Sequence, residues 1–318
     1  MKLLTFELQG SEYLGALTDN GVVNLSAAAP DDLAFSSMQH FIEAGQPALD
    51  RAYAQLASSP DTIASDQINW LAPLPVPAQI RDCLGFETHL KNAFESAVKV
   101  SAMAADDPVK AEEELRASGR FVVPEVWYQQ PIYYKANRFS VAPTGKDIVW
   151  PAYSQIMDFE LEMACIIGKK GKDITKSNAD DHIFGYTIYN DFSARDAQML
   201  ESPGMLGPAK GKDFEDSIIL GPVIVTKDEL DDPYNLRMQA RVNGETWCDN
   251  NSSTIHWTFS DMIAHISMGE TLHPGEVIGS GTVGLGCGLE QLRFLNDGDI
   301  VELEIEKIGV ISNKVIKR

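Results

Sequence analysis

The stretch Met157-Asp158-Phe159-Glu160-Leu161-Glu162-Met163-Ala164-Cys165-Ile166-Ile167 places acidic residues inside an apolar run. Successive side chains of a β-strand point to opposite faces. A strand here therefore carries an apolar face of Met157, Phe159, Leu161, Met163 and Cys165, and an acidic face of Asp158, Glu160 and Glu162. Because buried, unpaired like charges are costly, the acidic face needs compensation. A divalent metal ion with oxygen ligands, Arg and Lys partners, or the solvated face of an edge strand would each provide it.

Composition limits the classes of function. The chain has 318 residues, of which 44% are hydrophobic, so it is long enough to bury a large core. Its formal net charge is −20, and no Lys/Arg-rich run stands out, which argues against nucleic acid and anionic membranes as partners. No apolar run reaches the roughly 18 residues of a membrane-spanning helix. The first residues are typical of a strand rather than a signal peptide, so we expect a cytoplasmic protein.

The four cysteines are widely spaced and form no CxxC motif. Cys83 and Cys165 lie in apolar surroundings, which favours reduced core thiols over disulfides.

Turn and proline signals divide the chain. Residues 1–72 predict a small N-terminal α/β module with a β-hairpin and helices near 31–44 and 47–58, and residues 73–318 predict the main body. Within the body, residues 90–120 have helix-favouring composition with a break at Asp106-Asp107-Pro108. We interpret this segment as an exposed helical excursion, either a lid over a site or a surface helical pair without a role.

Short strands dominate the rest of the body. Ser260–Ser267 is typical of a helix with Ser260 as N-cap. The predicted strands are Ile132–Tyr134, Ile148–Trp150, Glu160–Ile167, Ile183–Tyr189, Ile218–Thr226, Met238–Val242, Glu276–Ser280 and Val301–Ile305. The fold class is therefore α+β and β-rich, with a mixed, curled sheet rather than alternating βαβ units.

A second acidic feature is the segment Tyr186-Thr187-Ile188-Tyr189-Asn190-Asp191, an apolar strand that delivers Asp191 at its end. If this end lies beside Glu160 and Glu162, three carboxylates converge on one cation, such as Mg²⁺. Arg195 and Gln198 follow about one helical turn later and could face the same cavity. Otherwise Asp191 is an N-cap, and Arg195 pairs with Asp196 or Glu201.

Two further motifs carry polar groups. His89 ends Arg81-Asp82-Cys83-Leu84-Gly85-Phe86-Glu87-Thr88-His89 and could transfer a proton, although a single histidine is more often structural. Gly279-Ser280-Gly281-Thr282-Val283-Gly284 satisfies GxGxxG, but no helix follows it, which argues against a dinucleotide site. We interpret it as a loop that lets backbone approach a ligand, with Thr282 and Glu290 as available polar groups.

Together these motifs resemble the fumarylacetoacetate hydrolase family. The likeness extends over about residues 75–310 and rests on matches at Asp82 to His89, Glu160-Leu161-Glu162, Asn190 to Asp196 with Gln198, Gly211-Lys212-Asp213-Phe214, and Gly281-Thr282. The resemblance implies a mixed β-roll or barrel catalytic domain, usually a homodimer. It also implies a Mg²⁺, Mn²⁺ or Ca²⁺ ion that polarises a 2-oxo or 2,4-diketo acid.

The same resemblance assigns roles to residues of this chain. Metal ligands would be Glu160, Glu162, Asp191 and Asp82. His89 would be the general base with Glu290 as its carboxylate partner, and Lys212 would stabilise an oxyanion. Substrate contacts would come from Arg195, Gln198, Tyr134 and Thr282. The residues after His89 depart from the family pattern, because the Ala/Glu-rich insertion stands there.

The leading functional hypothesis is a metal-dependent hydrolase that cleaves a C–C bond in an acylpyruvate-type acid, with His89 activating water and an enolate as intermediate. Other enolate chemistry on the same site is the alternative: decarboxylation of an oxaloacetate-type acid, dehydration of a sugar acid, or isomerisation. A catalytically silent metal-binding or interaction protein is a third hypothesis, disfavoured by the presence of His89 and Lys212 together.

Overall fold

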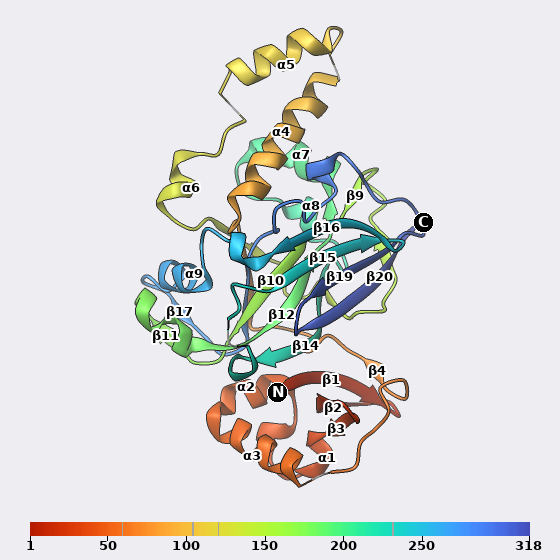
Figure 1. Cartoon of the computed structure of the whole chain (residues 1–318), viewed down its shortest axis with the longest axis vertical. Coiled ribbons are helices and arrows are strands. Elements are labelled where there is room, and N and C mark those ends of the chain that lie inside the picture. Colours follow the sequence, from red (N-terminus) through yellow and green to blue (C-terminus); the bar gives the residue numbers. More distant parts are fainter. Residues whose placement is uncertain (59, 104, 120, 231) are drawn as a thin grey trace.

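Two sheets of unequal size and two short strand pairs organise the protein in a computed structural model that describes residues 1–58, 60–103, 105–119, 121–230 and 232–318 (Figure 1). The predicted strand-rich α+β class is confirmed. Each sheet runs from one edge strand to another, so neither closes into a barrel within the described residues.

The large sheet contains the strands that carry the predicted acidic residues. In spatial order it consists of β3 (Gly21–Asn24), β2 (Ser11–Thr18), β1 (Lys2–Leu8), β14 (Ile218–Thr226), β12 (Ile183–Asp191), β10 (Leu161–Ile167), β18 (Glu276–Gly279), β5 (Gln79–Cys83) and β6 (Tyr133–Ala136). β4 (Asn69–Trp70) pairs with β1, and β7 (Val141–Ala142) pairs with β14. The pairing is mainly antiparallel, but β18 and β5 run parallel.

The smaller sheet lies against the large one. Its order is β16 (Glu245–Asn251), β15 (Arg237–Val242), β19 (Ile300–Ile305), β20 (Gly309–Lys317) and β8 (Ile148–Trp150). The two short pairs join β11 (Gly171–Lys172) to β17 (Thr271–Leu272) and β9 (Met157–Asp158) to β13 (Ser193–Ala194).

The helices lie at the margins of the sheets (Figure 1). They are α1 (Leu25–Ala28), α2 (Met38–Ala44), α3 (Gln46–Ala57), α4 (Glu87–Met103), α5 (Pro108–Ala117), α6 (Glu125–Gln129), α7 (Arg195–Glu201), α8 (Ala209–Lys212) and α9 (Phe259–Ile266).

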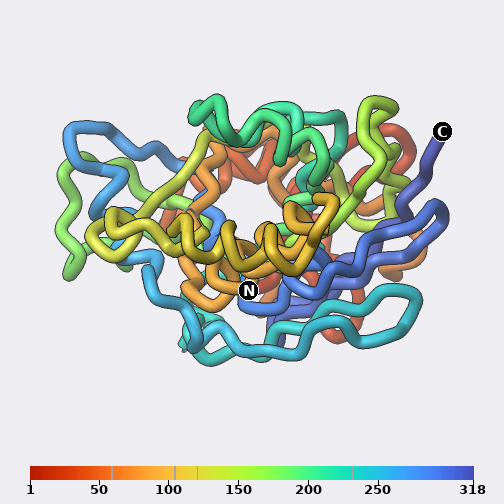
Figure 2. The backbone as a smooth tube through the Cα atoms, turned by 90° about the horizontal axis from the view of Figure 1, so that it is seen from above, coloured from red at the N-terminus to blue at the C-terminus, as the bar shows by residue number. Residues whose placement is uncertain are grey.

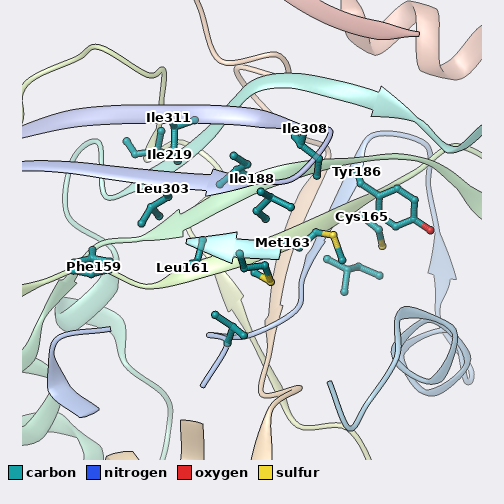
Figure 3. Close-up of a cluster of buried hydrophobic side chains, with 14 of the residues drawn as sticks. Phe159, Leu161, Met163, Cys165, Tyr186, Ile188, Ile219, Leu303, Ile308 and Ile311 are labelled. Carbon is teal, nitrogen blue, oxygen red and sulfur yellow. The ribbon is translucent and has the colours of Figure 1, made fainter. Parts of the chain in front are cut away.

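Alternation along β10 divides the core as the sequence predicts. Leu161 and Met163 belong to the apolar cluster between the two sheets, which also contains Leu303 of β19 (Figure 3). Ala164 and Ile166 point to the other face and join the cluster beneath the N-terminal helices. Both faces are therefore buried, and Glu160 and Glu162 occupy the second face at the start of the strand.

The N-terminal segment extends the large sheet. β1 pairs with β14 through Lys2↔Val225 and Leu3↔Ile224, so hydrogen bonding continues across the predicted boundary. Leu3 is buried in the same cluster as Ile166. The division into 1–72 and 73–318 stays a prediction.

The helical excursion forms with its predicted break. α4 and α5 are separated at Asp107, whose side chain accepts a hydrogen bond from the backbone N–H of Lys110 and caps α5. Arg116 of α5 reaches back to Glu95 of α4, with Nη1 and Oε2 2.7 Å apart. Seen from above, the excursion crosses the middle of the molecule, and the segment of α7 and α8 runs along one side (Figure 2). Its action as a lid stays a prediction.

Two helix starts differ from the sequence predictions. α9 begins after Thr258 rather than Ser260, because Thr258 and Asp261 form a reciprocal capping box. The helix expected near 31–44 is confined to α2, which Ser37 caps, after a short 3₁₀ turn at Leu33–Phe35. In both regions several residues can cap a helix, so composition alone does not select the starting point.

The shared core makes a testable prediction for Leu3. We expect Leu3→Ala to lower the free energy of unfolding by about 2–5 kcal/mol, because it opens a cavity in a fully buried site. Leu33→Ala is the matched control, since Leu33 is 70% exposed, and we expect it to change stability by less than about 0.5 kcal/mol. Urea unfolding followed by circular dichroism measures both. Equal midpoints for the two variants would contradict the role of β1 in the core.

Candidate active site

Adjacent strands of the large sheet bring three carboxylates together. Glu162 lies in β10, Asp191 ends β12 on one side of it, and Asp82 lies near the end of β5 beyond β18. One carboxylate oxygen from each residue falls within 4.8 Å of the others. All three side chains are buried. This acidic trio consists of Asp82, Glu162 and Asp191.

The acidic trio fits a hard divalent cation. Asp82 Oδ1 and Asp191 Oδ1 are buried and have no hydrogen-bond partner among the described residues. Burial raises the pKa of the Asp82 carboxyl well above its usual range, and the charge of Asp191 raises it further. Burial and the nearby Asp82 likewise raise the pKa of Glu162. Three clustered carboxylates, two of which keep an oxygen without a donor, are the donor set that Mg²⁺, Mn²⁺ or Ca²⁺ would satisfy.

The glycine-rich loop gives the acidic trio its space. An added Cβ at Gly279 would lie 2.5 Å from Asp82 Oδ1 and 3.0 Å from Glu162 Oε2. Two residues later, the backbone N–H of Gly281 donates to Glu162 Oε2 at 2.9 Å. Thr282 Oγ1 lies 3.5 Å from Glu162 Oε1. The backbone of the glycine-rich loop therefore lies close to the carboxylates of Asp82 and Glu162.

Glu160 lies next to the acidic trio, but its carboxylate oxygens are not part of the cluster that Asp82, Glu162 and Asp191 form. Its Oε2 lies 2.7 Å from Lys212 Nζ, and its Oε1 lies 2.7 Å from Arg195 Nη2. Burial raises the pKa of Glu160, but Lys212 and Arg195 outweigh it and hold the pKa well below its usual range. Compensation by Arg and Lys thus applies to Glu160, and its role as a metal ligand stays a prediction.

Lys212 connects Glu160 to the acidic trio. Its Nζ lies 2.8 Å from Asp191 Oδ2 as well as near Glu160. Burial lowers the pKa of Lys212, but the two carboxylates outweigh it, so Lys212 stays charged. α8 carries Lys212 and packs closely against α7 at Gly211. A Cβ at Gly211 would lie only 2.6 Å from the Cβ of Gln198 in α7, so this packing needs glycine.

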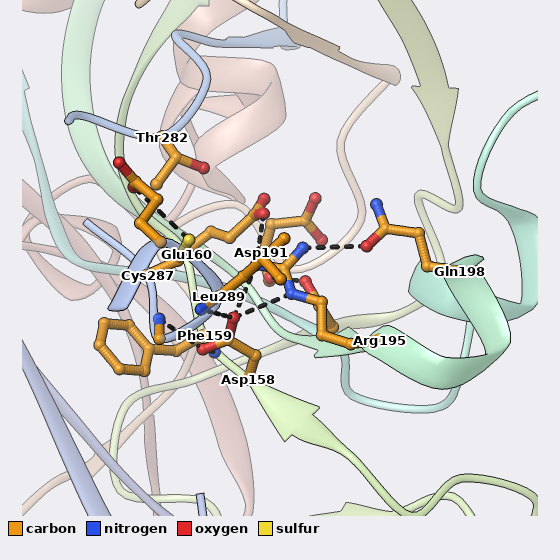
Figure 4. A network of polar contacts seen from close by, with 12 residues as sticks. Asp158, Phe159, Glu160, Asp191, Arg195, Gln198, Thr282, Cys287 and Leu289 are labelled. Atoms are coloured by element: carbon orange, nitrogen blue, oxygen red, sulfur yellow. Dashed lines mark hydrogen bonds and ion pairs between the residues drawn. The ribbon is translucent and has the colours of Figure 1, made fainter. Parts of the chain in front are cut away.

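Three of the remaining predicted contact residues, Arg195, Gln198 and Thr282, are labelled together with Glu160 and Asp191 in Figure 4. The Tyr134 hydroxyl donates to Asp191 Oδ2 at 2.7 Å. Tyr134 of β6 lies directly opposite Asp82 of β5, which brings its side chain to the acidic trio. Arg195 Nη1 donates to Gln198 Oε1 at 2.9 Å. Asp191 is not the N-cap of α7, since that position is Ala194, so the N-cap alternative is wrong.

The general base predicted from the sequence meets its predicted partner. His89 Nδ1 lies 2.9 Å from Glu290 Oε1. Glu290 Oε2 accepts hydrogen bonds from Asn92 Nδ2 and from the backbone N–H of Leu285, both at 2.8 Å. α4 carries both His89 and Asn92, one helical turn apart. The Glu290 side chain is fully enclosed.

Cys287 links the His89–Glu290 dyad to the acidic residues. Its backbone forms an isolated bridge with Glu160. Its Sγ lies 3.9 Å from His89 Nδ1 and 3.5 Å from Glu290 Oε1. Burial, reinforced by Asp158, raises the pKa of the Cys287 thiol well above its usual range. All four cysteines are buried and free, as expected from their spacing.

Four residues at the site received no role there from the sequence: Asp158, Asn92, Gly279 and Cys287. Two of them left a signal in the sequence. Asp158 shares the alternating face of Glu160 and Glu162, and Asn92 follows His89 at helical spacing. Gly279 and Cys287 depend on long-range sheet pairing, which local patterns do not reveal.

Comparison with known proteins identifies the family. The model of the fumarylacetoacetate (FAA) hydrolase C-terminal family matches residues 105–316. The chain belongs to the fumarylacetoacetate hydrolase family. The resemblance proposed from the motifs is thereby confirmed.

Relatives with assigned activities extend the match over nearly the whole chain. Oxaloacetate tautomerase FAHD2A, mitochondrial, from Homo sapiens is 34% identical over 96% of this chain and 87% of the relative. Oxaloacetate tautomerase YisK from Bacillus subtilis is 29% identical over 99% of this chain and 100% of the relative.

Solved structures agree on the fold of this family member. Fumarylacetoacetate hydrolase from Exiguobacterium antarcticum superposes with a TM-score of 0.72 at 25% identity, covering 100% of both chains. Maleylpyruvate hydrolase from Sphingobium sp. SYK-6, solved with a manganese(II) ion and pyruvate, gives a TM-score of 0.73 at 21% identity and covers 100% of this chain and 99% of its own. At that identity the second match supports the fold alone.

No helix within the described residues is long and apolar enough to cross a membrane. Several relatives carry "mitochondrial" in their names, so the expected cytoplasmic location stays a prediction.

The buried carboxylates lead to a prediction about metal and stability. We expect Mg²⁺ to raise the melting temperature of the wild-type protein at pH 8, because an ion that binds only the folded state stabilises it by about 2.7 kcal/mol at 100 times Kd. In Asp82→Asn the rise should disappear. The metal-free variant should melt above the metal-free wild type, since Asn removes a buried carboxyl whose pKa is raised by burial and by Asp191 and which therefore opposes folding at this pH.

Differential scanning fluorimetry with and without Mg²⁺ measures this. Asp61→Asn, at an exposed carboxylate, is the control and should respond to Mg²⁺ like the wild type. An equal Mg²⁺ response in Asp82→Asn would exclude the acidic trio as the ion site.

Proposed function

We propose that the protein interconverts the enol and keto forms of a short 2-oxo dicarboxylic acid, such as oxaloacetate, at a divalent-ion site. The observation that carries the proposal is the pairing of His89 with Glu290 at 2.9 Å, joined through Cys287 to the buried carboxylates. The oxaloacetate tautomerase names of relatives that match nearly the whole chain support this substrate class. Isomerisation was an alternative in the sequence analysis, and the relatives favour it over C–C hydrolysis.

The reaction needs a proton acceptor and an electrophile. Asp82, Glu162 and Asp191, with Glu160 beside them, would hold the ion, which polarises the 2-oxo group when bound. The enol loses the proton of its C2 hydroxyl, and C3 gains one, so no water or other reactant is consumed. A side chain that both accepts and donates a proton is sufficient.

We assign this proton transfer to His89. Its Nδ1 contacts Glu290, which leaves Nε2 for the substrate. Glu290 is itself fixed by Asn92 and the Leu285 amide, so the imidazole has a defined orientation. Proton transfer by a positioned histidine typically contributes about 10²–10⁴-fold to a rate.

Lys212 supplies a fixed positive charge beside the reacting group. It stays charged between Glu160 and Asp191, so it can stabilise negative charge on the C2 oxygen. We assign Arg195, Gln198, Tyr134 and Thr282 to the walls of the same cavity, as the family resemblance implies.

The proposed activity predicts the behaviour of His89 variants. With Mg²⁺ and freshly dissolved enol oxaloacetate, we expect His89→Gln and Glu290→Gln to lower kcat for enol loss by about 10²–10⁴-fold. His40→Gln is the control, because His40 hydrogen-bonds Ser36 far from the site, and it should keep wild-type activity. Ultraviolet absorbance of the enol follows the reaction, and Mg²⁺-induced thermal stabilisation of each variant verifies its folding.

Product analysis separates the alternatives. Keto oxaloacetate as the only product supports tautomerisation. Release of CO₂ would indicate decarboxylation, and two carbon fragments from an acylpyruvate would restore the hydrolase hypothesis. Wild-type enol loss in His89→Gln would remove His89 from the mechanism.

A further inference from the structure

Asp158 lies between the two halves of the site and is fully buried. We propose that Asp158 is a positioning residue that fixes the Arg195–Glu160 pair and the Glu290 turn relative to one another. The inference rests on the proposed function, because it assumes that the carboxylate side and the His89–Glu290 dyad act on one substrate.

On the carboxylate side, Asp158 holds Arg195. Arg195 Nε and Nη2 each lie 2.8 Å from Asp158 Oδ2, and the same Nη2 reaches Glu160 Oε1 at 2.7 Å. Nε donates a hydrogen bond to Asp158, whereas the Nη2 contacts are ion pairs, and together these contacts hold the guanidinium in place. They also balance its charge, so that Arg195 can approach the acidic trio without presenting a free cation to a bound metal ion.

On the dyad side, Asp158 holds the turn that presents Glu290. The backbone N–H of Gly288 donates to Asp158 Oδ1 at 2.7 Å, and that of Leu289 donates to Oδ2 at 2.9 Å. The 3₁₀ turn Leu289–Gln291 follows directly and contains Glu290. Gly288 allows this approach, since an added Cβ would lie 2.7 Å from Asp158 Oδ1.

One carboxylate therefore accepts from a guanidinium and from three backbone amides, those of Gly288, Leu289 and its own neighbour Phe159, all within the buried site (Figure 4). An amide at this position offers one oxygen and places N–H donors against the other donors. Asp158→Asn should release Arg195 and the Glu290 turn together. Losing a contact that orients the residues around a metal ion typically costs about 10–100-fold in metal affinity or activity.

A neighbouring acid offers a matched control. Asp196 follows Arg195 directly and accepts from Ser154 Oγ at 2.5 Å and from the Gln155 backbone N–H at 2.7 Å. Like Asp158, Asp196 is therefore a hydrogen-bonded carboxylate near Arg195, but none of these hydrogen bonds involves Glu160 or Glu290. Asp196→Asn thus tests whether the loss of any carboxylate near Arg195 is enough to weaken Mg²⁺ binding and loosen the Glu290 turn.

Two readouts that do not depend on turnover test the contacts. Calorimetric titration with Mg²⁺ should give a Kd about 10–100-fold higher for Asp158→Asn than for wild type or Asp196→Asn. Hydrogen exchange at the amides of Gly288 and Leu289 should accelerate only in Asp158→Asn. Unchanged Mg²⁺ affinity together with unchanged exchange would overturn the proposal.

A double-mutant cycle tests whether Asp158 acts through Glu290. If it does, the loss in kcat caused by Asp158→Asn is smaller in a Glu290→Gln background than in the wild type, and only the share that acts through Arg195 and Glu160 remains. An undiminished effect of Asp158→Asn in the Glu290→Gln background would overturn its action on the Glu290 turn. Should Asp158→Asn not fold, Asp158→Glu keeps the charge but displaces it and takes its place in the cycle. Failure of both variants to fold would assign Asp158 a purely structural role.

The cycle also separates this inference from the proposed function. Full activity in Glu290→Gln would refute the proposed dyad, whatever Asp158 does. An inactive Glu290→Gln beside a wild-type-like Asp158→Asn would refute only the positioning role.

Discussion

Mutual repulsion among buried carboxylates is the constraint on which the rest of this structure depends. Asp82, Glu162 and Asp191 come from strands of one sheet and meet where water is excluded. Lys212 and Arg195 neutralise Glu160 and part of Asp191, but Asp82 Oδ1 and Asp191 Oδ1 have no donor among the described residues. A divalent cation is the partner that would balance such a group and also polarise a 2-oxo acid.

The acid–base pair is built into the same framework. His89 and Asn92 come from α4, whereas Glu290 comes from a turn that follows the glycine-rich loop. The backbone of Cys287 pairs with that of Glu160 in an isolated β-bridge, and the Cys287 thiol lies against both members of the dyad. The proposed proton-transferring group, His89, is thereby connected to Glu160 through Cys287.

The sequence predicted the site better than the reaction. Alternation around Glu160-Leu161-Glu162 indicated the two faces of β10, and the clusters on each face confirm it. Asp82 was assigned to the site only by family resemblance. Its strand β5 reaches β10 through β18, which lies almost 200 residues after β5 in the chain, and local sequence patterns do not reveal such a pairing. The N-cap at Thr258 was missed since Ser260 is equally able to cap a helix. Hydrolysis and tautomerisation use the same residue types, and the relatives were needed to favour one.

Anomalous diffraction from crystals soaked in Mn²⁺ would locate a bound ion. We expect one strong peak within coordination distance of Asp82, Glu162 and Asp191, beside Glu160, in the wild-type protein. A peak held instead by His89, Cys287 and Glu290, which also lie close enough to bind an ion, would contradict it. So would the absence of any peak at the acidic trio under saturating Mn²⁺.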